Sequence, residues 1–194
     1  MRPIIVDTCA LVMLIRIVPK MLKDDRFNCV TIRSIRDEFI RTSKFKDKYP
    51  WRKKLTGEID TIGTTHEAKT EVNLNKKVID RMILEGVENK KTGKIFDLSK
   101  TDRELLAWAL VLKRYLVSGD GNIGEFGHQE FSSIFIGHLS PLELLNDWIE
   151  HKLLVWDDKL QLYLEDWQKN EEKSQSSCQI ARFETLTEYP YVGS

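Results

Sequence analysis

A short apolar run that ends on a carboxylate is the feature that most constrains the fold of this chain. The run from Pro3 to Val6 is followed at once by Asp7 and Thr8, and a second apolar segment extends from Ala10 to Ile17. An unbroken apolar run is typical of a parallel strand buried on both faces, and the later segment has helical spacing. The sequence therefore predicts a strand–helix unit of a parallel α/β sheet. Because such sheets bind ligands at the carboxyl ends of their strands, Asp7 is a candidate functional residue.

Three more acidic residues occupy comparable positions later in the chain. The segment Asn28–Ile32 is predicted to be a second strand, and the helix that follows it carries Glu38. Asp102 opens a helix that leads into the predicted strand Tyr115–Ser118, and Asp120 follows that strand. A helix of about 12 residues is about 18 Å long, and about five residues of strand return roughly the same distance. We therefore expect these carboxylates at the same edge of the sheet as the first one.

The length and composition fit one domain rather than two. The chain has 194 residues, of which 41% are hydrophobic, which is enough for one ordinary core. We expect an α/β fold: a three-layer α/β/α sandwich with a central, mostly parallel sheet of four to five strands, plus a C-terminal helical extension. The predicted boundaries are a domain at 1–150 with a charged excursion at about 41–93, the helical extension at 151–173 and a flexible tail at 174–194.

Three further segments carry local structure signals. Leu74, Val78 and Met82 have the spacing of one face of an amphipathic helix inside the excursion. The run Phe131–Ile136 is predicted to be another strand. Ser140–Pro141 starts a helix, with the serine as its cap and the proline as its first residue.

An apolar stripe follows this helix start. Leu142, Ile149, Trp156 and Tyr163 recur at an interval of seven residues. One interpretation is a helix, broken near Asp157–Asp158, that packs on the domain. The other is a seam for a homodimer or for a protein partner.

Basic residues are concentrated in one part of the chain, although the whole sequence has 30 basic and 30 acidic residues. Between residues 16 and 54 basic residues are in excess, whereas acidic residues dominate the segment 143–172. Aromatic residues are interleaved with the basic ones, a combination that can contact phosphates and stack on bases. The candidate nucleic-acid contacts are Lys44, Lys46, Lys48, Trp51, Arg52, Lys53 and Lys54. The alternative is a solvated loop whose aromatic residues belong to the core.

Clustered carboxylates need a partner. Two like charges about 4 Å apart repel by roughly 4 kcal/mol at an effective dielectric constant of about 20, so a cation or protonation must relieve them. Oxygen-only ligation indicates Mg²⁺ or Mn²⁺, and the histidines lack the paired spacing of a zinc site. Taken one at a time, the acids have simpler explanations. Asp102 can cap its helix together with Ser99, Asp120 can belong to a hairpin turn, and Glu38 can be a solvated helix residue.

The cysteines and the hydropathy predict the compartment. Cys9, Cys29 and Cys178 form no C-x-x-C motif and are odd in number, which favours a reducing cytosol. The sequence contains no run of about 18 apolar residues that could cross a membrane. We therefore expect a soluble, cytoplasmic protein with no membrane partner.

Four stretches resemble the PIN domain, the nuclease fold of VapC-type toxins and related RNA-processing enzymes. They are PIIVDTCALV with Asp7, VTIRSIRDEF with Glu38, DLSKTDRELLAWAL with Asp102, and LVSGDGNI with Ser118 and Asp120. The resemblance covers most of residues 1–150 and is dense in those stretches. It implies that the four acids hold one or two Mg²⁺ or Mn²⁺ ions, and that the Ser118 hydroxyl orients a carboxylate or a water molecule.

The function that this resemblance implies is a metal-dependent endoribonuclease. Such an enzyme hydrolyses RNA phosphodiester bonds and leaves a 5′-phosphate and a 3′-hydroxyl. It would act in RNA processing or as the toxin of a toxin–antitoxin pair, with an antitoxin or another protein as its partner. Two alternatives are a catalytically silent scaffold that binds RNA or protein, and a DNA nuclease with the same metal chemistry. The presence of all four acids argues against the scaffold.

Overall fold

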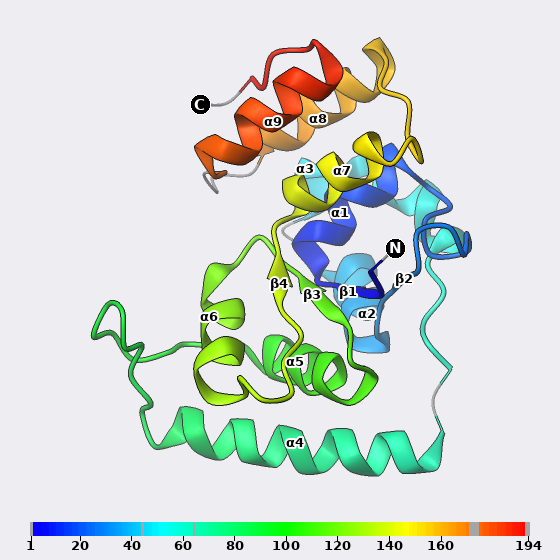
Figure 1. Cartoon of the computed structure of the whole chain (residues 1–194). Coiled ribbons are helices and arrows are strands. Elements are labelled where there is room, and N and C mark those ends of the chain that lie inside the picture. The colour runs from blue at the N-terminus through cyan, green and yellow to red at the C-terminus, as the bar shows by residue number, and fades with distance from the viewer. Residues whose placement is uncertain (1, 44, 64, 171–174, 193–194) are drawn as a thin grey trace.

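A four-stranded parallel sheet flanked by helices forms the centre of the computed structural model, which describes residues 2–43, 45–63, 65–170 and 175–192 (Figure 1). The strand order is β2-β1-β3-β4, and each neighbouring pair is parallel. The strands are β1 (Ile4–Val6), β2 (Cys29–Val30), β3 (Tyr115–Val117) and β4 (His138–Leu139). The predicted α/β class is therefore confirmed, with a sheet of four strands.

The handedness of the crossovers decides which helices cover which face. The chain moves from β1 to β2 in one direction along the sheet and from β3 to β4 in the other. Since parallel crossovers are right-handed, opposite directions place the connecting helices on opposite faces. Accordingly α1 (Thr8–Ile17) lies on one face with α7 (Pro141–Glu150), and α6 (Gly121–Glu130) lies on the other with α5 (Lys100–Leu112) (Figure 1). The remaining helices are α2 (Arg33–Arg41), α3 (Phe45–Lys48), the 3₁₀ helix η1 (Pro50–Glu58), α4 (His66–Leu84), α8 (Asp158–Asn170) and α9 (Ser177–Thr187).

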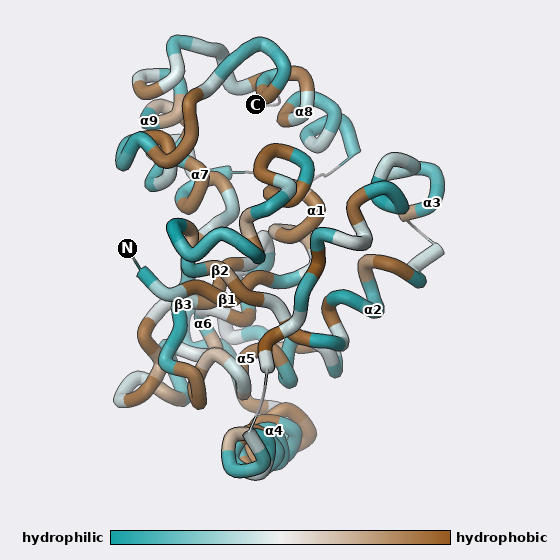
Figure 2. The backbone as a smooth tube through the Cα atoms, turned by 90° about the vertical axis from the view of Figure 1, so that its right-hand side faces the viewer, coloured by the Kyte–Doolittle hydropathy of each residue, from teal (hydrophilic) through white to brown (hydrophobic). Residues whose placement is uncertain are grey.

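The core lies where α1 covers the sheet. All of β1 is fully buried, as its unbroken apolar sequence predicts, and Leu11, Leu14 and Ile15 of α1 are buried as well. Both elements are hydrophobic along most of their length in Figure 2. Burial of one such side chain stabilises a fold by about 1.5–3 kcal/mol relative to leaving it exposed. The first strand–helix unit therefore anchors the domain.

The predicted strand at Phe131–Ile136 is wrong. The chain forms helical-type turns there, in which the amide of Phe135 donates to the carbonyl of Phe131 at 2.7 Å. Phe131 and Phe135 are buried, whereas Ile134 is exposed, so the apolar side chains follow a spacing of four rather than the alternation of a strand. The strand β4 starts only at His138, and α6, which the sequence analysis does not predict, precedes the turns.

The charged excursion contains the predicted amphipathic helix with a different buried face. Val72 and Ile79 of α4 are buried, while Leu74 and Val78 are 60% and 47% exposed. The helix lies across α5 (Figure 1), and Arg103 of α5 donates to Asp80 of α4 at 2.9 Å. Val72 and Ile79 are seven residues apart and therefore lie on one face of α4, and this narrow apolar face packs toward α5.

The apolar stripe packs against the core of the domain itself, and the partner seam on it stays a prediction. The chain breaks between α7 and α8, near the predicted Asp157–Asp158, and Leu142 and Leu160 from the two sides of the break are buried. Ile149, Trp156 and Tyr163 pack against the same core. The alternative interpretation, a broken helix that packs on the domain, is the one that the structure supports.

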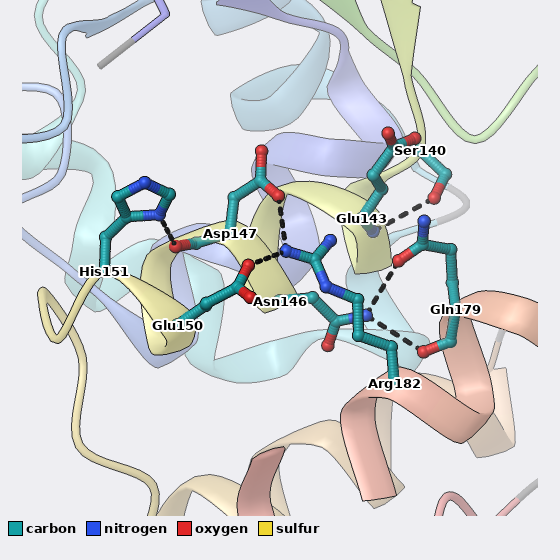
Figure 3. A network of polar contacts seen from close by, with 8 residues as sticks. All are labelled: Ser140, Glu143, Asn146, Asp147, Glu150, His151, Gln179 and Arg182. Atoms are coloured by element: carbon teal, nitrogen blue, oxygen red, sulfur yellow. Dashed lines mark hydrogen bonds and ion pairs between the residues drawn. The ribbon is translucent and has the colours of Figure 1, made fainter. Parts of the chain in front are cut away.

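The predicted flexible tail at 174–194 is also wrong for its described residues, 175–192, because α9 folds against α7. Phe183 is fully buried, and Asn146 donates to the carbonyl and the side-chain oxygen of Gln179, both at 2.9 Å. Arg182 pairs with Asp147 at 2.9 Å and with Glu150 (Figure 3). The sequence analysis misses this helix because the segment is mostly polar, and a few apolar residues such as Phe183 are enough to pack it against the domain.

Among the described helices, none is long and apolar enough to cross a membrane.

Candidate active site at the carboxyl edge of the sheet

The strand order reverses between β1 and β3, and the candidate site lies at this switch point. β2 is on one side of β1, and the chain continues through β3 to β4 on the other side. Asp7 directly follows β1, and Ser118 directly follows β3. Ligands of open α/β sheets bind outside the carboxyl ends of strands at such a point. The topology alone therefore places these two residues together.

One hydroxyl group joins the two strands. Ser118 Oγ donates to Asp7 Oδ2 at 2.6 Å and accepts from the amide of Asp120 at 2.9 Å. The other oxygen of Asp7 accepts from the amide of Ala10 at 2.6 Å, so Asp7 is also the N-cap of α1. Asp7 and Ser118 are 7% and 2% exposed. The structure therefore joins the side chains of Asp7 and Ser118, and Asp120 reaches them through its backbone amide.

A second hydroxyl group ties Glu38 to the same edge. Thr8 Oγ1 donates to Glu38 Oε2 at 2.7 Å, and Thr8 is the residue after Asp7. Glu38 reaches this position because Ile35 and Phe39, which flank it on α2, are buried. The carboxylate of Glu38 therefore contacts the first residue of α1.

Asp102 is held within its own helix. Its Oδ2 accepts from the amide of Ser99 at 3.0 Å, and the hydroxyl of Ser99 accepts from the amide of Asp102 at 3.1 Å. These two bonds form a capping box at the start of α5. The simpler explanation for this acid is thus confirmed, whereas Asp120 caps α6, by accepting from Asn122 at 3.0 Å, instead of forming a hairpin turn.

The predicted carboxylate cluster is not assembled in this arrangement. Within residues 2–43, 45–63, 65–170 and 175–192, no three histidine, cysteine or acidic side chains are placed to hold one metal ion. One oxygen each of Asp7, Asp102 and Asp120 instead accepts a hydrogen bond at a helix start. In the same part of the chain, Glu38, Asp102 and Asp120 form no ion pair with lysine or arginine. The donors fit a hard divalent cation in chemistry but not in position.

His138 is a neighbour of this edge that the sequence analysis misses. Its Nε2 lies 3.0 Å from the carbonyl oxygen of Ser118, and α6 packs so closely that a Cβ on Gly124 would lie 2.5 Å from the ring. Burial lowers the pKa of His138 below 6.5, and the bond to the Ser118 carbonyl opposes this in part. A neutral ring with its proton on Nε2 therefore supports the strand end that carries Ser118. No sequence signal marks this histidine, because β4 is displaced from its predicted position.

The predicted nucleic-acid contacts divide into buried and exposed residues. Arg52 is 4% exposed, and its guanidinium donates to the carbonyls of Phe39 and Thr42 at 3.0 and 3.1 Å, so its predicted surface role is wrong. Trp51 is half-buried beneath the guanidinium of Arg16. Of the lysines, Lys44 lies outside the described residues, Lys48 donates to the carbonyl of Asn170 at 2.7 Å, and Lys46, Lys53 and Lys54 are exposed.

No protein-family model matches the sequence, and no curated protein or solved structure shows significant similarity to it. The fold and the geometry of this edge therefore carry the functional argument.

We predict that Ser118→Ala lowers the free energy of unfolding by about 1–3 kcal/mol, because it removes a buried hydrogen bond to Asp7 and one from the amide of Asp120. Urea denaturation measures the change. The exposed Ser133→Ala is the matched control and should change stability by less than about 0.5 kcal/mol. Equal stability of wild type and Ser118→Ala would show that the hydroxyl does not join the two strands.

The lowered pKa of His138 predicts an acid-sensitive contribution to stability. Because the folded state holds the proton less tightly, the unfolded chain binds it first as the pH falls below 6.5. This contribution is complete above that pH and is lost below it, at a rate that approaches about 1.4 kcal/mol per pH unit. We expect wild type to lose more stability between pH 7.5 and pH 5.5 than His138→Gln in urea titrations. The exposed His66→Gln is the matched control and should lose as much stability as wild type. An equal loss in wild type and in His138→Gln would contradict the assignment.

Proposed function

We propose that this chain is a metal-dependent endoribonuclease of the PIN type. The observation that carries the proposal is the pair of hydroxyl bonds at the switch point, Ser118 to Asp7 and Thr8 to Glu38. They hold two carboxylates from different elements at the edge where parallel sheets bind ligands. The amide of Asp120 bonds to the first of these hydroxyls, which adds a third acidic residue to the same edge.

The chemistry of the donors supports Mg²⁺ or Mn²⁺ as the cofactor. Asp7, Glu38, Asp102 and Asp120 would hold the ion, which when bound supplies Lewis-acid stabilisation of charge on a phosphoryl group. Ser118 and the amide of Ala10 fix the orientation of Asp7. Asp102 and Asp120 must leave their caps to join it, and a lost helix cap costs about 0.5–2 kcal/mol. This cost lowers the apparent affinity for the ion relative to that of a preformed site.

RNA is the proposed substrate because of the basic excursion and the resemblance of the four acidic stretches to PIN-domain nucleases. Lys46, Lys53 and Lys54 are exposed and available for phosphates. The second candidate function, a silent scaffold that binds RNA or protein, is favoured by one observation: the acids serve as caps in the described arrangement. A DNA nuclease with the same metal chemistry is the third.

The test is cleavage of labelled single-stranded RNA and of matched single-stranded DNA, with Mn²⁺ or with EDTA. We expect Mn²⁺-dependent cleavage of RNA that leaves a 5′-phosphate. Asp7→Asn should lower the rate by roughly 100-fold or more, as loss of one preorganised electrostatic group does in other enzymes. Asp102→Asn should also lower the rate, because in the proposed site Asp102 leaves its helix cap and holds the ion. Asp97→Asn, an exposed acid just before α5, is the matched control and should cleave at the wild-type rate.

The outcomes separate the three functions. Cleavage of DNA alone would assign a DNA nuclease. Binding of RNA without cleavage in Mn²⁺ would assign the scaffold. Full activity of Asp102→Asn with loss in Asp7→Asn would confine the site to the switch point and leave Asp102 as a cap.

A further inference from the structure

A cleft lies between α4, the start of α2 and α5, outside the acidic edge itself. Its volume is about 440 Å³, within the range of small-ligand pockets of roughly 300–1,000 Å³. Its floor is apolar and its rim is basic. The residues that the argument uses are Ile32, Arg33, Lys69, Val72, Lys76 and Trp108.

The rim presents cations from two different helices. Arg33 opens α2, and Lys69 and Lys76 are seven residues apart on α4, which puts them on one face of that helix. In the described part of the chain, neither Arg33 nor Lys69 pairs with a carboxylate. The ammonium group of Lys76 is 3.9 Å from Asp80, a loose pair in which it can still bind an anion. Glu104 is the acidic residue among those that line the cleft, so the lining has a positive balance.

The floor offers a surface for a base or a sugar. Ile32, Val72 and Trp108 line the cleft from three elements, and Trp108 is 7% exposed. The indole of Trp108 keeps one fixed orientation because it is largely buried, and its small exposed part, with those of Ile32 and Val72, gives apolar contact for a base or a sugar. An apolar floor beneath a cationic rim fits a nucleotide better than it fits a bare anion.

The cleft continues the elements that carry the proposed site. Arg33 opens α2 just after the carboxyl end of β2. Between them, Thr31 Oγ1 donates to the carbonyl of Val6, the residue before Asp7, at 3.3 Å, so the cleft begins at the same edge of the sheet as Asp7. In this proposal, a strand of RNA whose scissile phosphate lies at the acidic edge continues toward the cleft.

We propose that this cleft binds the single-stranded RNA next to the cleaved bond, with phosphates on Arg33, Lys69 and Lys76 and a base against Trp108. The assignment rests on the proposed nuclease function for its substrate class. It differs from the exposed lysines at 46, 53 and 54, which lie in α3 and η1. The helix α4, which belongs to the charged excursion, thus forms one side of the proposed RNA-binding cleft.

The experiment measures RNA binding apart from cleavage, with the full chain in EDTA and a fluorescent single-stranded RNA. Lys69→Ala and Lys76→Ala should each raise Kd several-fold, and each should reduce the slope of log Kd against log salt by about 0.7, the value for one lost phosphate contact on a single strand. Glu104→Gln should lower Kd, because it removes the negative charge from the same lining. Lys77→Ala, an exposed neighbour on α4 outside the cleft, is the matched control and should leave both quantities unchanged.

The outcomes distinguish this inference from the proposed function. Unchanged Kd and slope in Lys69→Ala and Lys76→Ala would overturn the cleft, and a wild type that still cleaves RNA in Mn²⁺ would keep the nuclease. Weakened binding in these variants, together with no cleavage by wild type, would support the cleft and overturn the nuclease. Absence of RNA binding by wild type would overturn the cleft. An equal loss of affinity in Lys77→Ala would also overturn it, since the effect would then be one of general charge.

Discussion

The hydroxyl of Ser118 makes the interaction on which the carboxyl edge of the sheet, where the candidate site lies, depends. It is a single group that donates to a buried carboxylate after β1 and accepts from the amide that begins the turn after β3. It therefore couples the two strands at the point where the strand order reverses. His138 supports the same residue from β4 through the Ser118 carbonyl, and Thr8 extends the connection to Glu38 on α2. Three strands and two helices meet around these few polar contacts.

In the proposed function, helix capping and cation binding would compete for the same oxygens. Asp7, Asp102 and Asp120 each stabilise a helix start, and a carboxylate near a helix N-terminus gains typically about 0.3–1 kcal/mol from the dipole. A cation that binds all three carboxylates must release more free energy than these three helix starts lose. The competition gives the acids a role in folding in addition to their proposed role in chemistry. It also explains why a sequence pattern for a metal site coincides with three helix starts.

The elements with strong local signals were predictable, and those set by packing were not. The unbroken apolar run of β1 and the cap at Ser140 specify their structures without help from the rest of the chain. By contrast, Phe131 and Phe135 suggest a strand in the sequence, but they pack on α6 at helical spacing. The strand β4 therefore begins later than predicted, at His138, and the role of this histidine was not foreseen. The buried face of α4 depends on where α5 lies, and Arg52 is buried because the carbonyls of α2 need donors. Such choices are made by tertiary contacts that a linear pattern does not contain.

Direct measurement of Mn²⁺ binding tests the central claim, that the carboxylates at this edge form a metal site. Electron paramagnetic resonance reports free Mn²⁺ during a titration with wild type and with Asp7→Asn, and thermal unfolding of the same samples reports linked stability. The account predicts loss of the free-ion signal with wild type alone, together with stabilisation of about 2.7 kcal/mol at 100 times Kd. Retention of the full free-ion signal with wild type, and no thermal shift, would contradict it. Asp7, Asp102 and Asp120 would then be helix caps alone.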